Sequence, residues 1–134
     1  ENYQKRLSGP LLDRIDININ VEKVKNSDLL KHIETKKDEH NAVKNTITGA
    51  FLRQKARYKD DGVYNSTLSS FQVSRLLKMD SAAEKLLQSA SEKLNLSARA
   101  YFKTIKVAQT IADLESSSII TTKHLAEALT YRKR

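Results

Sequence analysis

The sequence predicts a mainly α-helical fold, a bundle of four or five helices preceded by one β-strand. Three observations support this class. Apolar residues recur at helical spacing from about residue 35 to the end of the 134-residue chain. Two Ser-x-x-Gln/Glu patterns within that stretch are typical of capping boxes at helix starts. Only residues 15–22 give a convincing run of strict apolar–polar alternation, the pattern of a half-buried strand.

The predicted strand has the sequence Ile15-Asp16-Ile17-Asn18-Ile19-Asn20-Val21-Glu22, with β-branched residues at its apolar positions. A single strand leaves its backbone groups unpaired and one apolar face uncovered. Because no later segment supplies convincing partners, we expect the rest of the sheet to lie outside these residues. Gly9 and Pro10 predict a tight connection that leads into the strand.

After the strand, a short helix could form over residues 27–33, and the helices of the bundle are expected over 35–59, 69–77, 81–94, 97–115 and from Thr121 or Thr122 onward. The helix over 35–59 should be amphipathic, and Gly62 should take the left-handed conformation that follows it. Ser69 and Ser81 are the expected caps of the next two. The helix over 97–115 has apolar residues along two lines, which predicts packing partners on two sides.

Composition indicates one domain with a short appendage. Hydrophobic residues make up 39% and charged residues 30% of the chain, which is typical of a folded, soluble protein. No apolar run approaches the roughly 18 residues of a membrane-spanning helix, so we expect a cytoplasmic protein without membrane contact. There is no cysteine, and the histidines His32, His40 and His124 are too scattered to predict a metal site.

The net charge of +8 favours phosphate or nucleic-acid partners, although a solvated lysine-rich surface gives the same value. Glycines occur only at positions 9, 49 and 62, which excludes a GxxxxGK[ST] phosphate loop. Two arginines stand out. Arg14 precedes the predicted strand, and Arg99 lies in the first turn of a predicted helix, where anions are favoured. The guanidinium group of an arginine is well suited to binding a polyphosphate. The alternatives are an ion pair of Arg14 with Asp13 or Asp16 and a solvated Arg99.

Three blocks of this sequence resemble, in order, the end of the ATPase core and the helical lid of magnesium-chelatase-like AAA+ ATPases, especially those of the competence type. They are YQKRLSGPLLDRID at residues 3–16, LSARA with KVAQTIADLE at 96–100 and 106–115, and HLAEALTYR at 124–132. Residues 23–94 match only in helical character. The resemblance implies that residues 1–26 end the core, that 27–134 form the lid, and that the phosphate loop and the acidic magnesium-binding motif lie upstream.

The resemblance also implies roles for single residues. Arg14 matches the arginine finger, a catalytic residue that reaches the γ-phosphate bound by the adjacent subunit. Arg99 matches the sensor 2 arginine, which binds the γ-phosphate of the subunit's own nucleotide and reports ATP against ADP. Gln109 stands where many relatives have arginine. Lys103 and Lys106 follow Arg99 by one and two turns, where they could tune the phosphate pocket or face solvent.

For the longer protein, the resemblance implies ATP and Mg²⁺ as cofactors, a ring of identical subunits, expected to be a hexamer, and branch migration or unwinding of DNA. A basic helix with Arg53, Lys55, Arg57 and Lys59 is compatible with contacts to DNA phosphates. The 134 residues alone are expected to bind no cofactor and to be inactive. Two alternatives remain: a chelatase motor that acts on a partner protein, and a stand-alone basic helical module that binds nucleic acid.

Overall fold

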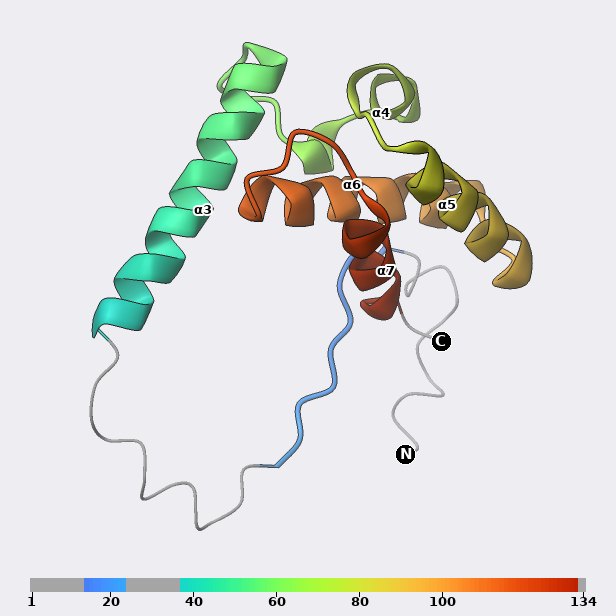
Figure 1. The fold of residues 1–134 in the computed structure, drawn as a ribbon, viewed down its shortest axis with the longest axis horizontal. Coiled ribbons are helices and arrows are strands. Elements are labelled where there is room, and N and C mark those ends of the chain that lie inside the picture. The colour runs from blue at the N-terminus through green and yellow to red at the C-terminus, as the bar shows by residue number, and fades with distance from the viewer. Residues whose placement is uncertain (1–13, 24–36, 133–134) are drawn as a thin grey trace.

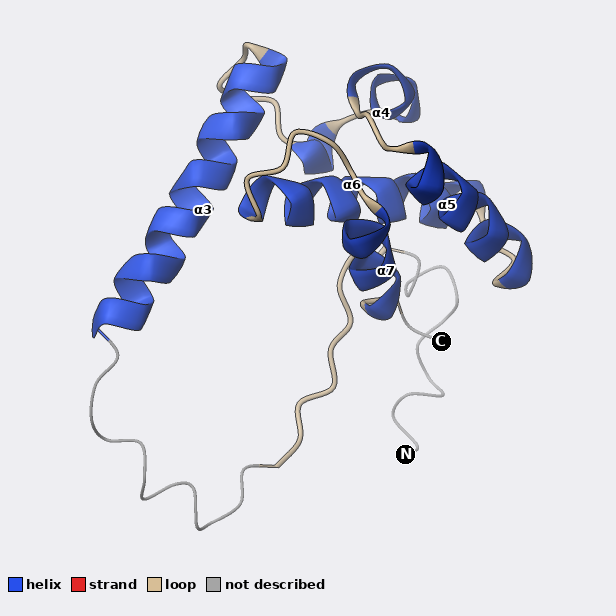
Figure 2. Cartoon of the chain, in the orientation of Figure 1, coloured by secondary structure: helices blue, strands red, loops and turns tan. Residues whose placement is uncertain are grey.

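The computed structural model describes residues 14–23 and 37–132, which are mainly helical (Figures 1 and 2). The elements are α3 (Lys37–Tyr58), the short 3-10 helix η2 (Asn65–Thr67), α4 (Ser70–Leu76), α5 (Ser81–Lys93), α6 (Ala98–Leu114) and α7 (Thr122–Thr130). The predicted helical class is therefore confirmed. The predicted helix over 27–33 and the Gly9-Pro10 connection lie outside the described residues. No helix in the described ranges combines the length and apolarity needed to cross a membrane.

The predicted strand over residues 15–22 is not formed. Residues 14–23 run as a loop, and the apolar side chains Ile15, Ile17, Ile19 and Val21 are 44–84% exposed (Figure 2). A strand needs a neighbour to satisfy its backbone N–H and C=O groups, and the described ranges contain no sheet to supply one. The alternation that predicted the strand is present, but residues 14–23 and 37–132 provide no surface that covers its apolar side chains.

Helix α6 is the centre of the bundle (Figure 1). It packs against α3, α4, α7 and η2, and α5 packs against α7. The prediction of a central helix with partners on two sides is confirmed. Its buried apolar residues join those of the surrounding helices in one core, made of Leu68, Val73, Leu77, Ala83, Leu87, Ile105, Ala108, Ile111, Ile120, Leu125 and Ala128. Burial of this apolar surface holds the helices together.

The predicted cap residues were correct in two of three cases. Ser69 caps α4, and the Ser69 amide in turn donates to the side-chain oxygen of Gln72 at 2.8 Å. Thr121 precedes α7, as one of the two predicted caps. The second predicted capping box was wrong, because α5 is capped by Asp80, whose carboxylate accepts from the Ala83 amide at 2.7 Å. Asp80 and Ser81 are adjacent acceptors, and the charged one takes the cap position.

Helix α3 is nearly as long as predicted but ends differently. Lys59, with a φ of 54°, takes the left-handed position after the helix, and no described glycine has a positive φ. Gly62 instead donates its amide to the Asp60 carboxylate at 2.7 Å. The first half of α3 projects away from the bundle (Figure 1), which leaves Val43 and Ile47 exposed although the sequence predicts them on its buried face.

Candidate functional site: a cationic groove along α6

A groove of about 870 Å³ runs along one face of α6, bordered by the segment at residues 14–17, by Ser66 of η2 and by the end of α7. The α6 residues that line it recur at helical spacing over the whole length of the helix. They are Ala98, Arg99, Phe102, Lys103, Lys106, Val107, Thr110, Ile111 and Leu114. The groove therefore has an apolar floor and a cationic rim.

Both arginines singled out in the sequence line this groove. Arg14 and Arg99 are exposed, and within residues 14–23 and 37–132 neither side chain has a hydrogen bond or ion pair. Ser97 caps α6 two residues before Arg99, so the Arg99 side chain lies in the first turn of the helix. The alternative pairing of Arg14 with Asp16 is not observed, because Asp16 lies 3.5 Å from the ammonium of Lys103; Asp13 lies outside the described residues.

Lys103 and Lys106 join the walls of the groove to α6. The Lys103 ammonium donates to the Ile15 carbonyl at 2.9 Å, and only 18% of its side chain is exposed. The Lys106 ammonium donates to the Ser66 carbonyl at 3.1 Å. These two lysines therefore do not merely face solvent, which was one of the two alternatives that the sequence left open; their tuning of a phosphate pocket stays a prediction.

Gln109 does not line the groove. It is fully buried, and its Nε2 donates to the Asp113 carboxylate at 3.1 Å, whereas its Oε1 has no hydrogen-bond partner. Gln109 thus belongs to the interior of the bundle.

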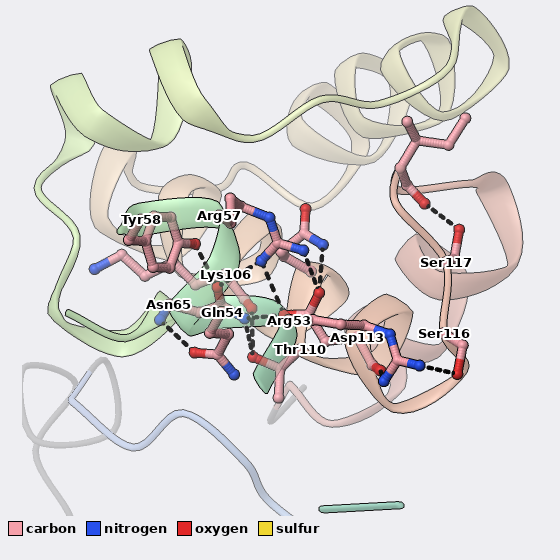
Figure 3. Close-up of polar contacts among 12 residues, drawn as sticks. Arg53, Gln54, Arg57, Tyr58, Asn65, Lys106, Thr110, Asp113, Ser116 and Ser117 are labelled. Atoms are coloured by element: carbon pink, nitrogen blue, oxygen red, sulfur yellow. Dashed lines mark hydrogen bonds and ion pairs between the residues drawn. The ribbon is translucent and has the colours of Figure 1, made fainter. Parts of the chain in front are cut away.

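A buried polar network around Asp113 holds α3 against α6 (Figure 3). Asp113 is fully buried, and both of its carboxylate oxygens accept from the guanidinium of Arg57. Asn65 donates its amide to Asp113 at 2.9 Å and to the hydroxyl of Thr110 at 3.0 Å. Gln54 accepts from the backbone of Asn65 at 2.8 Å. Burial alone would lower the pKa of Arg57, but the hydrogen bonds with Asp113 raise it above its ordinary value.

This network changes the interpretation of the basic helix. Arg53 donates to the Asp113 carbonyl at 3.2 Å and to the Ser116 hydroxyl at 2.6 Å, and Arg57 is paired with Asp113 (Figure 3). Lys55 pairs with Asp61 at 2.6 Å. Three of the four cations predicted to be compatible with DNA contacts therefore make contacts within the protein.

The exposed guanidinium groups at the rim of the groove suit phosphate groups. Guanidinium groups form charge-assisted hydrogen bonds with phosphate oxygens. In the described part of the chain, no group of three or more His, Cys, Asp or Glu residues could hold a metal.

Comparison with known proteins identifies the family. Residues 20–132 match the family model described as magnesium chelatase, subunit ChlI C-terminal, and residues 1–29 match the one described as magnesium chelatase, subunit ChlI. The chain is 36% identical to competence protein ComM of Haemophilus influenzae and 35% identical to the uncharacterized protein YifB of Escherichia coli K12. Each match covers 97% of this chain, which spans about a quarter of each relative (25%). The chain belongs to the magnesium-chelatase family of AAA+ proteins.

Proposed function

We propose that this chain is the lid region of a ring-forming ATPase and that it contributes Arg14 and Arg99 to the nucleotide sites of the ring. The proposal rests chiefly on one observation: the guanidinium groups of both arginines are exposed and have no partners among the described residues, so each is available to a phosphate. Membership of the AAA+ family supports ATP as the nucleotide. The core that would hold the phosphate loop and the magnesium ligands belongs to the remaining part of the longer protein.

The two arginines have different proposed tasks. Arg14 acts as an arginine finger, which stabilises the charge that develops on the γ-phosphoryl group during transfer. Arg99 binds the γ-phosphate when ATP is present and loses that contact with ADP, so that the position of the lid depends on the nucleotide. Loss of an arginine finger commonly costs about 10³–10⁵ in turnover.

Single substitutions in the full-length protein test these tasks. Arg14→Ala should lower ATP turnover by about 10³ or more and leave ATP affinity nearly unchanged, because the finger acts mainly in the transition state. Arg99→Ala should reduce the ratio of ATP to ADP affinity. Arg75→Ala is the matched control, since Arg75 is exposed on α4 and does not line the groove. Full turnover of Arg14→Ala would refute the role of Arg14.

Mixed rings determine which subunit supplies each arginine. The family resemblance assigns Arg14 to the nucleotide of the neighbouring subunit and Arg99 to the subunit's own nucleotide. Mixing Arg14→Ala with a phosphate-loop variant should then restore part of the hydrolysis, and mixing Arg99→Ala with the same variant should not. Rescue of both would mean that the two arginines of one chain act together on the neighbour's nucleotide. Light scattering with bound nucleotide should give the mass of the proposed hexamer.

We propose DNA as the substrate of the motor, with branch migration or unwinding as its action. The name of the ComM relative, a competence protein, and the charge of +8 support this choice. Binding of the full-length protein to branched and linear DNA should weaken steeply with salt, and branched DNA should stimulate hydrolysis. Hydrolysis that is insensitive to DNA but stimulated by a partner protein would favour the alternative, a chelatase-type motor.

A further inference from the structure

The segment that carries Arg14 is attached to the lid at two points. The ammonium of Lys103, in α6, donates to the Ile15 carbonyl at 2.9 Å and lies 3.5 Å from the carboxylate of Asp16. The amide of Asn18 donates to the carbonyl of Tyr131, just after α7, at 2.8 Å. Figure 1 shows this segment running beside α7. These contacts join the end of the proposed core to the lid.

We propose that Lys103 is a positioning residue, which holds Arg14 at a fixed place relative to Arg99. Arg14 is bonded directly to Ile15, whose carbonyl Lys103 binds, and Arg99 lies four residues before Lys103 on the same face of α6. Lys103 therefore links the two guanidinium groups through one side chain and one helical turn. This inference rests on the proposed function, in which both arginines bind nucleotide phosphate.

The side chain of Lys103 is suited to this task. Its three N–H donors can serve a carbonyl and a carboxylate together, and its aliphatic part is largely covered, with 18% of the side chain exposed. Asp16, in contrast, is 62% exposed. Loss of the ammonium therefore leaves the Asp16 carboxylate accessible to water, and we expect the bundle to stay folded when Lys103 is replaced.

The first test needs no ATP. In the 134-residue chain, Lys103→Met keeps the length of the side chain and removes its charge. Hydrogen exchange of the Asn18 amide should become about tenfold faster, because the segment loses its neighbouring attachment while the Tyr131 carbonyl stays in place. Lys106→Met is the matched control, because it also removes an ammonium from this groove. That ammonium donates to Ser66 and does not bind residues 15–16. Exchange should not change in the control, and unchanged thermal unfolding should confirm that both variants fold.

The second test uses the full-length protein and a double-mutant cycle. Lys103→Met should lower kcat about tenfold or more with little change in the KM for ATP, and Lys103→Arg should restore part of the loss. In an Arg14→Ala background, Lys103→Met should cause no further loss, because Lys103 acts through Arg14. Lys85→Met, on the exposed surface of α5, controls for a general effect of removing a lysine.

The two tests separate the inference from the proposed function. Unchanged exchange of Asn18 in Lys103→Met would overturn the attachment itself. If Lys103→Met speeds the exchange of the Asn18 amide but leaves kcat undiminished, the positioning role is overturned and the function of Arg14 stays intact. The same holds if Lys103→Met lowers kcat further in the Arg14→Ala background. Full turnover of Arg14→Ala would overturn the proposed function and with it the positioning role, whereas the exchange result would still establish the attachment.

Discussion

The carboxylate of Asp113 should be the most stability-sensitive charge in the described bundle. It is fully buried, and it accepts hydrogen bonds from Arg57, Asn65 and Gln109. Asp113→Asn keeps the shape of the side chain, removes the charge opposite Arg57 and replaces one acceptor with an NH₂ group that faces donors. Leaving a buried charge without its partner commonly costs about 3–5 kcal/mol. Because the Arg57 side chain is 18% exposed and keeps some water, we expect about 3 kcal/mol.

Urea unfolding of the 134-residue chain measures this cost. With an m-value of about 2 kcal/mol/M, a loss of about 3 kcal/mol lowers the midpoint by about 1.5 M at constant m. Asp61→Asn is the matched control, because it removes a carboxylate paired with Lys55 of the same helix α3, but both of those side chains are mostly exposed. The control midpoint should hardly change, since exposed ion pairs contribute little.

A double substitution sharpens the test. Once Arg57 is replaced by methionine, no buried guanidinium remains to be left unpaired, so Asp113→Asn should cost less in that background than alone. Two results would refute the reasoning. The first is a urea midpoint of Asp113→Asn equal to that of the Asp61→Asn control. The second is a double variant whose loss in the free energy of unfolding equals the sum of the losses in the two single variants.

Three further predictions concern single side chains. Ser69→Ala should destabilise the chain by about 1 kcal/mol in thermal unfolding, because α4 loses its N-cap; an unchanged Tm would contradict this. Burial raises the pKa of Tyr58 above 10.0, so the folded state holds the phenol proton more tightly than the unfolded state does. The free energy of unfolding should therefore fall as pH rises past about 10 in the wild type, and it should fall less in Tyr58→Phe. The hydrogen bond from Lys123 lowers the pKa of Glu115 below 4.5, so the ionised carboxylate stabilises the folded state. The wild type should therefore be more stable than Glu115→Gln at neutral pH, and this difference should vanish as pH falls through the folded-state pKa.

Local patterns predicted the helices well because helical spacing and caps involve residues within four positions of each other. The two lines of apolar residues on α6 placed it at the centre, and Ser69 with Gln72 marked the start of α4. The choice between adjacent caps, Asp80 and Ser81, depends on which oxygen reaches the first free amides. The sequence pattern does not encode that geometry.

The polar network could not be predicted from periodicity. Arg57 and Asp113 are 56 residues apart, and each alone resembles an ordinary helical charge. One signal was available: Asp113 follows Ile111 and Ala112 in the apolar pattern of α6, where a carboxylate needs a buried partner. The strand over 15–22 failed for the opposite reason, because its pattern indicates contacts with a surface that the described residues lack. The proposed roles of Arg14 and Arg99 depend on the family resemblance and stay predictions.

The groove and the polar network meet in α6, and this has a mechanical consequence. Thr110 lines the groove, and its hydroxyl also accepts the hydrogen bond from Asn65, which in turn contacts Asp113 (Figure 3). Moving α3 away from α6 would break the buried Arg57–Asp113 pair at a cost of about 3–5 kcal/mol, so we expect the two helices to move as one body. Any surface that binds the projecting half of α3 would therefore move the groove as well, and with it Arg99.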